Sequence, residues 1–310
     1  MIANLSILIK RLCLKTGGGS VSSLQVEISI TIVDNILRRP HPGGDEGLDI
    51  RVGTSGYSFK DWRGTFYPEN LRAADMLRYY AEHFNVVEVN STYYRIPPVR
   101  TFQRMAEKTP DGFEFTVKAH SDITHSRENV RESARALQES VQPLIEEGKF
   151  GAFLAQFPYS FKFSSENMGY LAEVSRIFEG YPLVVEFRHR SWVRDDVFEF
   201  LRENGIGYCC VDEPRLRGLV PPVTLTTGEI GYVRFHGRNA AKWWEGGSSE
   251  RYDYLYSEEE LIEWRPKIEK LAREANKTYL FFNNCHNGQA AINAQMMLDI
   301  LGLRRKEDAG

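Results

Sequence analysis

The stretch Asn85-Val86-Val87-Glu88-Val89-Asn90-Ser91 carries the pattern that decides the fold. An apolar run ends there in two polar side chains, Glu88 and Asn90, which stand two residues apart. Residues i and i+2 of a β-strand point to the same face, so both polar groups share one face of the predicted strand. The same pattern ends five further apolar runs, at Lys118 and His120, Glu186 and Arg188, Cys210 and Asp212, Arg234 and His236, and Asn283 or Asn284.

Many strands therefore contribute polar groups to one face. A lone buried charge is costly, so charges that recur at the same end of successive strands indicate a shared, water-accessible mouth in which they offset one another. This mouth is the candidate functional site.

Apolar runs bounded by turn residues predict eight strands, and segments with apolar residues at helical spacing separate most of them. This alternation favours a parallel sheet with helical crossovers. The 254 residues from Ile50 to Leu303 are close to the ~250 typical of a closed barrel. We therefore predict a single α/β domain over 49–304, a (β/α)8 TIM-type barrel. The predicted strands are 50–54, 85–91, 113–119, 149–156, 182–188, 206–212, 230–236 and 277–284, and the predicted helices are 71–84, 130–144, 168–178, 197–203, 261–275 and 289–301.

An open, doubly wound sheet is the alternative architecture. Such a sheet usually carries a glycine-rich phosphate-binding turn after its first strand. The turn Gly53-Thr54-Ser55-Gly56 has neither the dinucleotide-binding spacing nor the P-loop spacing, so the barrel is favoured.

Composition is that of an ordinary globular enzyme-sized protein, with 42% hydrophobic and 26% charged residues. The net charge of −3 argues against a globally basic nucleic-acid surface. The four cysteines show no C-x-x-C spacing, which favours a reducing, cytoplasmic location. The apolar start, Met1 to Ile9, is too short to span a bilayer, so no membrane association is expected.

The two ends of the chain fall outside the strand and helix pattern. Glycine- and proline-rich stretches at 17–20 and 40–44 predict a flexible extension over 1–48, and 305–310 reads as a tail. The alternative for the extension is a strand near Val26 to Val33 that closes the bottom of the barrel.

Distinctive motifs of the chain begin with Gly53-Thr54-Ser55-Gly56-Tyr57, Phe66-Tyr67-Pro68 and the run from Val87 to Arg95. These motifs resemble those of the YecE-like family, known as domain of unknown function 72. The resemblance covers about 49–303 and implies a TIM-type barrel without an established reaction. Further motifs that carry it are Val185-Glu186-Phe187-Arg188, Ser191-Trp192, Tyr232-x-Arg234-Phe235-His236-Gly237-Arg238-Asn239 and Trp243-Trp244.

An anionic ligand is the leading prediction for the mouth. Active sites of such barrels lie at the C-terminal ends of the strands, and anions often bind after strands 7 and 8 near a helix N-terminus. Arg234, Arg238 and Asn239 follow the seventh strand, and Asn283 and Asn284 precede the last helix. For that helix, Asn287 is the predicted N-cap, which would leave amides free for phosphate.

Two more cations, Arg188 and Lys118, are predicted on the other side of the mouth. Arginine in particular binds phosphate or carboxylate through two hydrogen bonds. The alternative reading is that Arg234, Arg188 and Lys118 only neutralise carboxylates in an ion network between strands. Those carboxylates would be Glu88, Glu186 and Asp212.

Acid and base groups at the same mouth would allow hydrolysis or isomerisation of the ligand. We predict Glu88, Glu186, Asp212 and His236 as the catalytic candidates, since each ends a strand on the inferred inner face. No cofactor is predicted. These residues and His120 leave a divalent metal site open as an alternative, which the interleaved arginines and lysine oppose.

Aromatic residues are concentrated after the seventh strand and recur near the first two. Trp243 and Trp244 stand within this segment, and a binding rim is predicted to be extended by Tyr57, Trp62, Tyr93 and Tyr94. Asn90 is a further predicted ligand-binding residue. Aromatic rings mixed with cations can stack bases while holding phosphates, so the alternative function is a non-catalytic nucleic-acid-binding module. The alternative explanation for these aromatic residues is that the loop folds over the barrel and buries its own rings. The other aromatic residues of the segment are Tyr252, Tyr254 and Tyr256.

Overall fold

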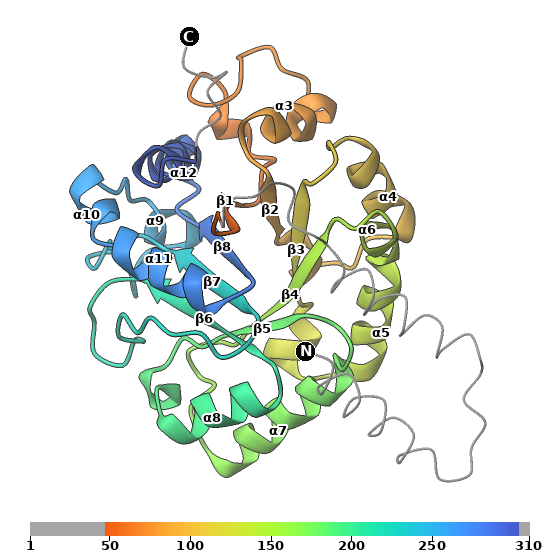
Figure 1. Ribbon diagram of the computed structural model, residues 1–310, viewed down its shortest axis with the longest axis vertical. Coiled ribbons are helices and arrows are strands. Elements are labelled where there is room, and N and C mark those ends of the chain that lie inside the picture. The colour runs from red at the N-terminus through yellow and green to blue at the C-terminus, as the bar shows by residue number, and fades with distance from the viewer. Residues whose placement is uncertain (1–46, 304–310) are drawn as a thin grey trace. The chain divides into compact units, whose positions relative to one another are not determined.

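The computed structural model describes residues 47–303, and within them eight parallel strands form a closed barrel in chain order (Figure 1). This confirms the (β/α)8 fold and the position of every predicted strand. The predicted extension lies outside the described residues except for its last two, and the predicted tail lies wholly outside them. The strands are β1 Ile50–Ser55, β2 Val86–Val89, β3 Glu114–Lys118, β4 Phe150–Gln156, β5 Leu183–Glu186, β6 Gly207–Asp212, β7 Ile230–Phe235 and β8 Lys277–Phe282.

Helices surround the barrel and bury their apolar faces against it (Figure 1). Their spacing of apolar residues predicted most of them, because an amphipathic helix on a sheet needs one buried stripe. The helices are α3 Met76–His83, α4 Val99–Glu107, α5 Val130–Ser140, α6 Gln142–Glu146, α7 Ser165–Ile177, α8 Asp195–Glu203, α9 Ser248–Arg251, α10 Glu258–Ile262, α11 Arg265–Glu274 and α12 Gln289–Ile300.

The helices of the structure differ from the predicted ones in several places, and the predicted helix 261–275 is divided between α10 and α11. The helix α4, with Phe102 and Met105 buried, was not predicted. The predicted helix 130–144 is two helices, α5 and α6, because Pro143 lacks the backbone N–H needed for the next hydrogen bond of a continuous helix. Between β6 and β7 the described chain forms no helix, and residues 213–229 cross as an irregular segment.

The register between strands fixes which side chains face the barrel interior. Arg234 of β7 lies opposite Val211 of β6 and Phe281 of β8, so these three point inward together. Their neighbours point outward, where the ring of Phe235 stacks on Phe282 at 4.5 Å between centroids and meets Trp264 at 5.1 Å. The strands are buried on both faces, as expected for a parallel sheet covered by helices.

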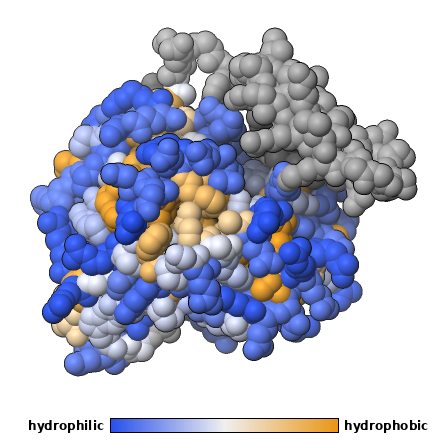
Figure 2. Space-filling model, turned by 90° about the horizontal axis from the view of Figure 1, so that it is seen from below, coloured by the Kyte–Doolittle hydropathy of each residue, from blue (hydrophilic) through white to orange (hydrophobic). Residues whose placement is uncertain are grey.

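One side of the protein has a mostly polar surface. Figure 2 shows one side of the protein, where hydrophilic residues predominate and apolar patches are scattered among them. Over residues 47–303, no helix has the length and apolar content needed to cross a membrane.

Candidate functional site

Arg234 stands at the centre of the mouth and joins two buried carboxylates. Its Nη2 lies 2.7 Å from Oε1 of Glu88, and its Nη1 lies 2.6 Å from Oε2 of Glu186. All three side chains project inward from the C-terminal ends of β7, β2 and β5, as their spacing predicted. Both terminal nitrogens of Arg234 are thus engaged by carboxylates, which offsets the cost of burying the three charges.

Neighbouring polar groups fix the Glu88 carboxylate. Tyr232 donates a hydrogen bond from its hydroxyl to Oε2 of Glu88 at 2.6 Å, and Asn90 donates from Nδ2 to Oε1 at 3.0 Å. The Tyr232 hydroxyl also lies 3.0 Å from Oγ1 of Thr116. Asn90, predicted to bind ligand, therefore uses one donor to hold Glu88.

The Glu186 carboxylate connects Arg234 with a second arginine and a histidine. Nε of Arg188 lies 2.5 Å from Oε1 of Glu186, and Nε2 of His236 lies 3.1 Å from the same oxygen. On its other side, Nδ1 of His236 lies 3.1 Å from Nδ2 of Asn283. Arg188 keeps 11% of its side chain exposed, compared with 2% for Arg234, so Arg188 is the arginine nearer to solvent.

Lys118 completes the cations of the mouth without an ion pair of its own. Its Nζ donates to Oε1 of Gln156 at 2.9 Å and lies 4.6 Å from the centroid of the Tyr93 ring. Gln156 is oriented by its own donation to the Phe157 carbonyl at 2.8 Å. Among the described residues, no carboxylate oxygen lies within 4 Å of the Lys118 ammonium.

Glu213 is a third carboxyl of the mouth, which the sequence did not predict. Its Oε2 lies 3.7 Å from Nη1 of Arg188, and its Oε1 accepts a hydrogen bond from the Val220 amide at 3.0 Å. Burial raises the pKa of Glu213 to about 8, an effect that Arg188 only partly offsets. Glu213 is therefore mainly a neutral carboxylic acid at pH 7.

Burial and neighbouring cations set the other protonation states. Burial alone would raise the pKa of Glu186, but Arg188 and Arg234 outweigh it and hold that pKa well below its usual range. Burial lowers the pKa of His236 to about 3, so its imidazole is neutral. Burial, helped by Arg234, lowers the pKa of Lys118 to about 7.

Asp212, a predicted catalytic residue of the mouth, lies on the outer side of β6 instead. Its carboxylate accepts hydrogen bonds from Arg238 at 2.9 and 2.8 Å, from Tyr256 at 2.8 Å and from Nε1 of Trp264 at 2.8 Å. The predicted inward position was wrong because β6 ends at two adjacent carboxyl residues, Asp212 and Glu213, and its sequence does not show which of the two faces the interior. Register places Cys209 inward instead, with Sγ 4.0 Å from Oε2 of Glu186.

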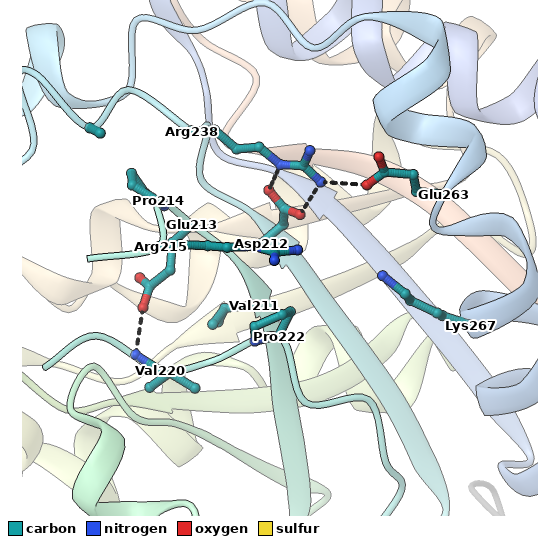
Figure 3. Close-up of a pocket in the computed structure, with 11 residues that line it drawn as sticks. Val211, Asp212, Glu213, Pro214, Arg215, Val220, Pro222, Arg238, Glu263 and Lys267 are labelled. Atoms are coloured by element: carbon teal, nitrogen blue, oxygen red, sulfur yellow. Dashed lines mark hydrogen bonds and ion pairs between the residues drawn. The ribbon is translucent and has the colours of Figure 1, made fainter. Parts of the chain in front are cut away.

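A cavity of about 310 Å³ opens beside Asp212, between the segment after β6 and the helices α10 and α11 (Figure 3). Its charged walls consist of three cations, Arg215, Arg238 and Lys267, and three carboxyl residues, Asp212, Glu213 and Glu263. Arg238 also contacts Glu263 at 3.3 Å and thereby joins the segment after β7 to the end of α10. With Glu213 mainly neutral, the three cations of this cavity outnumber its other two carboxylates.

Two other predicted ligand-binding residues organise the chain after β7. Asn239 donates to the carbonyls of Glu250 and Asp253 at 3.2 and 3.1 Å. Arg238 is engaged by Asp212, as described above, and by Glu260 at 3.1 Å. Their side chains therefore fold this segment over the barrel end.

The aromatic residues divide between core and surface. Trp243 is buried and meets Tyr252 at 6.1 Å between ring centroids, whereas Trp244 is 50% exposed and packs edge-on against Tyr159 at 4.8 Å. Tyr94 is 81% exposed. Tyr57 is partly buried, with its ring 6.2 Å from that of Tyr80.

The entry to the last helix differs from its prediction. Gly288, and not Asn287, is the N-cap of α12. Asn287 adopts a left-handed conformation with φ of 47°, and its backbone N–H donates a hydrogen bond to Oδ2 of Asp61 at 2.9 Å. Asn284 turns away from the mouth and donates to Oδ1 of Asn293 at 2.8 Å. Of the two predicted asparagines, only Asn283 joins the inner cluster.

An irregular turn follows β3 beside the mouth. Residues Asp122–Ser126 form a π-helical turn, and Arg127 and Asn129 after it have positive φ of 58° and 50°. Within the turn, the His125 ring lies 4.9 Å from that of Tyr93. Such π-helical turns and strained residues occur frequently at functional sites.

The groups brought together are thus those that end β2, β3, β4, β5 and β7, with Asn283 after β8 and Glu213 after β6. Gln156 could have been found from the sequence because it ends the fourth apolar run with the same spacing from Leu154. Glu213 could not, since its facing depends on the register of β6. In the described part of the chain, no three His, Cys, Asp or Glu side chains are grouped to hold a metal ion.

Comparison with known proteins places the chain in a family. The model of the family described as "Protein of unknown function DUF72" matches residues 51–309. The UPF0759 protein YunF of Bacillus subtilis strain 168 is 32% identical over 271 residues, which cover 82% of this chain and 95% of YunF.

Solved structures agree with this match. A DUF72 family protein from Thermotoga maritima MSB8 is 46% identical with a TM-score of 0.77, over 82% of this chain and 99% of that one. A DUF72 family protein from Enterococcus faecalis V583 is 31% identical with a TM-score of 0.75, over 83% and 97% of the two chains. The closed barrel, the match along nearly all of it and these relatives together make the chain a member of the DUF72 family.

Proposed function

We propose that the mouth binds a small ligand with a phosphate or another anionic group, and that carboxyl groups beside it hydrolyse or isomerise this ligand. The observation that carries the proposal is a charge imbalance. With Lys118 protonated, three cations, Lys118, Arg188 and Arg234, face two carboxylates, while the third carboxyl, Glu213, is mainly neutral. An anion would balance the excess.

The cations of the mouth then divide by role. Arg234 has both terminal nitrogens on carboxylates, so we assign it to holding Glu88 and Glu186 in place. Arg188 is more exposed, and Lys118 has no ion pair among the described residues; these two are therefore the ligand-binding groups. Arginine also suits the planar, two-point recognition of phosphate or carboxylate.

Glu186 and Glu213 are the proposed acid and base. The pKa of Glu186 is held well below its usual range, and that of Glu213 is raised to about 8. Two carboxyl groups whose environments separate their pKa values are suited to act as base and acid at the same pH. Arg188 contacts both, at 2.5 and 3.7 Å, so a ligand on Arg188 would lie beside them.

A nucleic-acid-binding module remains the second candidate. The exposed rings of Tyr94 and Trp244 favour it, because exposed aromatics can stack on bases. Burial of Trp243 and Tyr256 removes part of the aromatic surface on which this candidate depended. The small-ligand function is therefore the better supported of the two.

Thermal and denaturant unfolding with inorganic phosphate tests the proposal. Phosphate at ten times its Kd should stabilise the wild type by about 1.4 kcal/mol. Arg188→Gln should abolish this stabilisation, whereas Arg265→Gln, on the exposed Glu269 pair of α11, should retain it. An equal gain in all three proteins would contradict the anion site. Salt-sensitive binding of a single-stranded oligonucleotide, without any effect of phosphate, would favour the second candidate.

A further inference from the structure

The cavity beside Asp212 lies where the barrel lacks a helix. Every other pair of successive strands is joined by at least one helix, whereas residues 213–229 of the described chain form none. A crossover without a helix has no amphipathic face with which to fill the outer side of the sheet. The cavity of about 310 Å³ at this place is near the lower end of the size range of small-ligand pockets.

The wall after β6 is fixed by its own hydrogen bonds. Val220 donates its backbone N–H to Oε1 of Glu213 at 3.0 Å, which closes the loop that carries Arg215. Within this loop, the Leu216 N–H donates to the Pro214 carbonyl at 2.8 Å. The wall is therefore preformed, and a ligand would not have to order it on binding.

Arg238 engages the carboxylates on its side of the cavity. Its Nη2 lies 2.8 Å from Oδ2 of Asp212 and 3.3 Å from Oε2 of Glu263. Its Nη1 lies 3.1 Å from Oε1 of Glu260, which does not line the cavity. Three carboxylates thus surround one guanidinium, so Arg238 is not the group that would attract an anionic ligand.

The other two cations, Arg215 and Lys267, have no such partner. In the part of the chain that the structure describes, no carboxylate oxygen lies within 4 Å of either. The Lys267 ammonium lies 4.7 Å from the centroid of the Trp264 ring, which is buried and donates from Nε1 to Asp212 at 2.8 Å. This ring face orients the ammonium without neutralising it. Figure 3 shows Lys267 extending from α11 toward the segment that carries Arg215.

We propose that this cavity is a second ligand site, which binds a small organic carboxylate through Arg215 and Lys267. A guanidinium matches the two oxygens of a carboxylate. A single negative charge suits the site better than a phosphate dianion, because Asp212 and Glu263 line the same cavity.

The rest of the lining favours a ligand with a hydrocarbon body. Val220, Pro222 and Ala240 supply apolar surface, against which such a body would be removed from water. The site is independent of the proposed function, because it lies on the outer side of β6 and neither Arg188 nor Lys118 lines it. Either site can therefore exist without the other.

Titration of the full-length protein with benzoate tests this inference, with the broadening of the benzoate proton signals in NMR as the readout. We expect saturable binding, about tenfold weaker in Lys267→Gln and in Arg215→Gln, since each loses one charge-assisted hydrogen bond. Lys270→Gln on the same helix and Arg217→Gln on the same loop are matched controls, because neither residue lines the cavity. Both controls should bind benzoate as the wild type does.

Two further probes separate the charge of the ligand from its body. Acetate, which lacks the ring, should bind about tenfold more weakly than benzoate, because less apolar surface is buried. Benzamide keeps the ring and lacks the negative charge, so it should bind no better than acetate. Binding of benzamide equal to that of benzoate would overturn the role of the two cations.

Arg188→Gln separates this site from the mouth. Benzoate binding that is unchanged in Arg188→Gln and weakened in Lys267→Gln and Arg215→Gln supports the cavity. Binding that is lost in Arg188→Gln and retained in the other two places benzoate at the mouth and overturns this inference. Equal weakening in both controls, or the absence of saturable binding, also overturns it. Arg215 is exposed, so its exchange tests the site without a threat to folding. The stabilisation by phosphate is measured separately, so the proposed function stands or falls on its own.

Discussion

The two ends of the barrel hold charged clusters that resemble each other in composition and differ in balance. At the N-terminal ends of the strands, the floor cluster consists of Asp49, Arg51, Glu114, Lys277 and Tyr279. Glu114 lies 2.6 Å from Lys277 and 3.6 Å from Arg51, and accepts a hydrogen bond from Tyr279 at 2.5 Å. Arg51 in turn pairs with Asp49 at 3.0 Å. Among the described residues, two cations of the floor cluster thus meet two carboxylates.

The mouth is not balanced in this way. With Lys118 protonated, it sets three cations against two carboxylates and one mainly neutral carboxyl. It also leaves Nε of Arg234 and Oδ1 of Asn90 buried without a hydrogen-bond partner among the described residues. Buried polar groups are normally paired, so unpaired ones are a mark of function or strain. The contrast suggests that the floor stabilises the barrel and that the mouth is kept incomplete for a ligand, as in barrel enzymes generally.

The largest expected effect is that of Arg234→Met. Removing this guanidinium leaves Glu88 and Glu186 buried without their central partner, so unfolding free energy should fall by about 3 to 5 kcal/mol in urea denaturation. Exposed Arg265→Met is the control and should change stability little. If Arg234→Met were as stable as the wild type but no longer responded to phosphate, Arg234 would be a ligand-binding group, and the division of roles among the cations would be wrong.

A smaller effect is expected in the floor cluster from Glu114→Gln. Loss of charged hydrogen bonds to Lys277 and Tyr279 should cost about 1.5 to 3 kcal/mol of unfolding free energy. The stabilisation by phosphate should remain as in the wild type, since the floor cluster is proposed to bind no ligand. Denaturation with and without phosphate measures both quantities. If Glu114→Gln were no longer stabilised by phosphate, the assignment of ligand binding to the mouth alone would be wrong.

The smallest expected effect is a pH dependence that depends on Glu213. The folded pKa of about 8 lies above the ordinary value of 4.5, so the contribution of Glu213 is fully present below pH 4.5 and is lost as pH rises toward 8. Between pH 6 and 7, the wild type should lose up to about 1.4 kcal/mol relative to Glu213→Gln. Parallel stability profiles for the two proteins would show that Glu213 is ionised and that the mouth is less cationic than proposed.

Those parts of the protein that repeat along the chain could be predicted from it. Eight apolar runs with intervening helical patterns defined the barrel. Spacing placed Glu88, Glu186, Arg188, Arg234 and Lys118 inward, because successive side chains of a strand alternate between its two faces. The prediction failed where that signal was missing. At the end of β6, the adjacent residues Asp212 and Glu213 face opposite sides, and the sequence does not show which of them faces the interior. Asp212 was predicted there, and Glu213 is found there.

The sequence by itself determined the architecture and the kinds of charge that reach the mouth, since both follow from periodicity within single strands. Only the tertiary structure decided how these charges are used. That Arg234 is occupied by two carboxylates, that Glu213 is neutral and that Lys118 lacks an ion pair depend on distances between strands far apart in the chain and on burial by the whole barrel. A charge acquires its pKa and its role from its neighbours in space, and the sequence near each residue does not contain them.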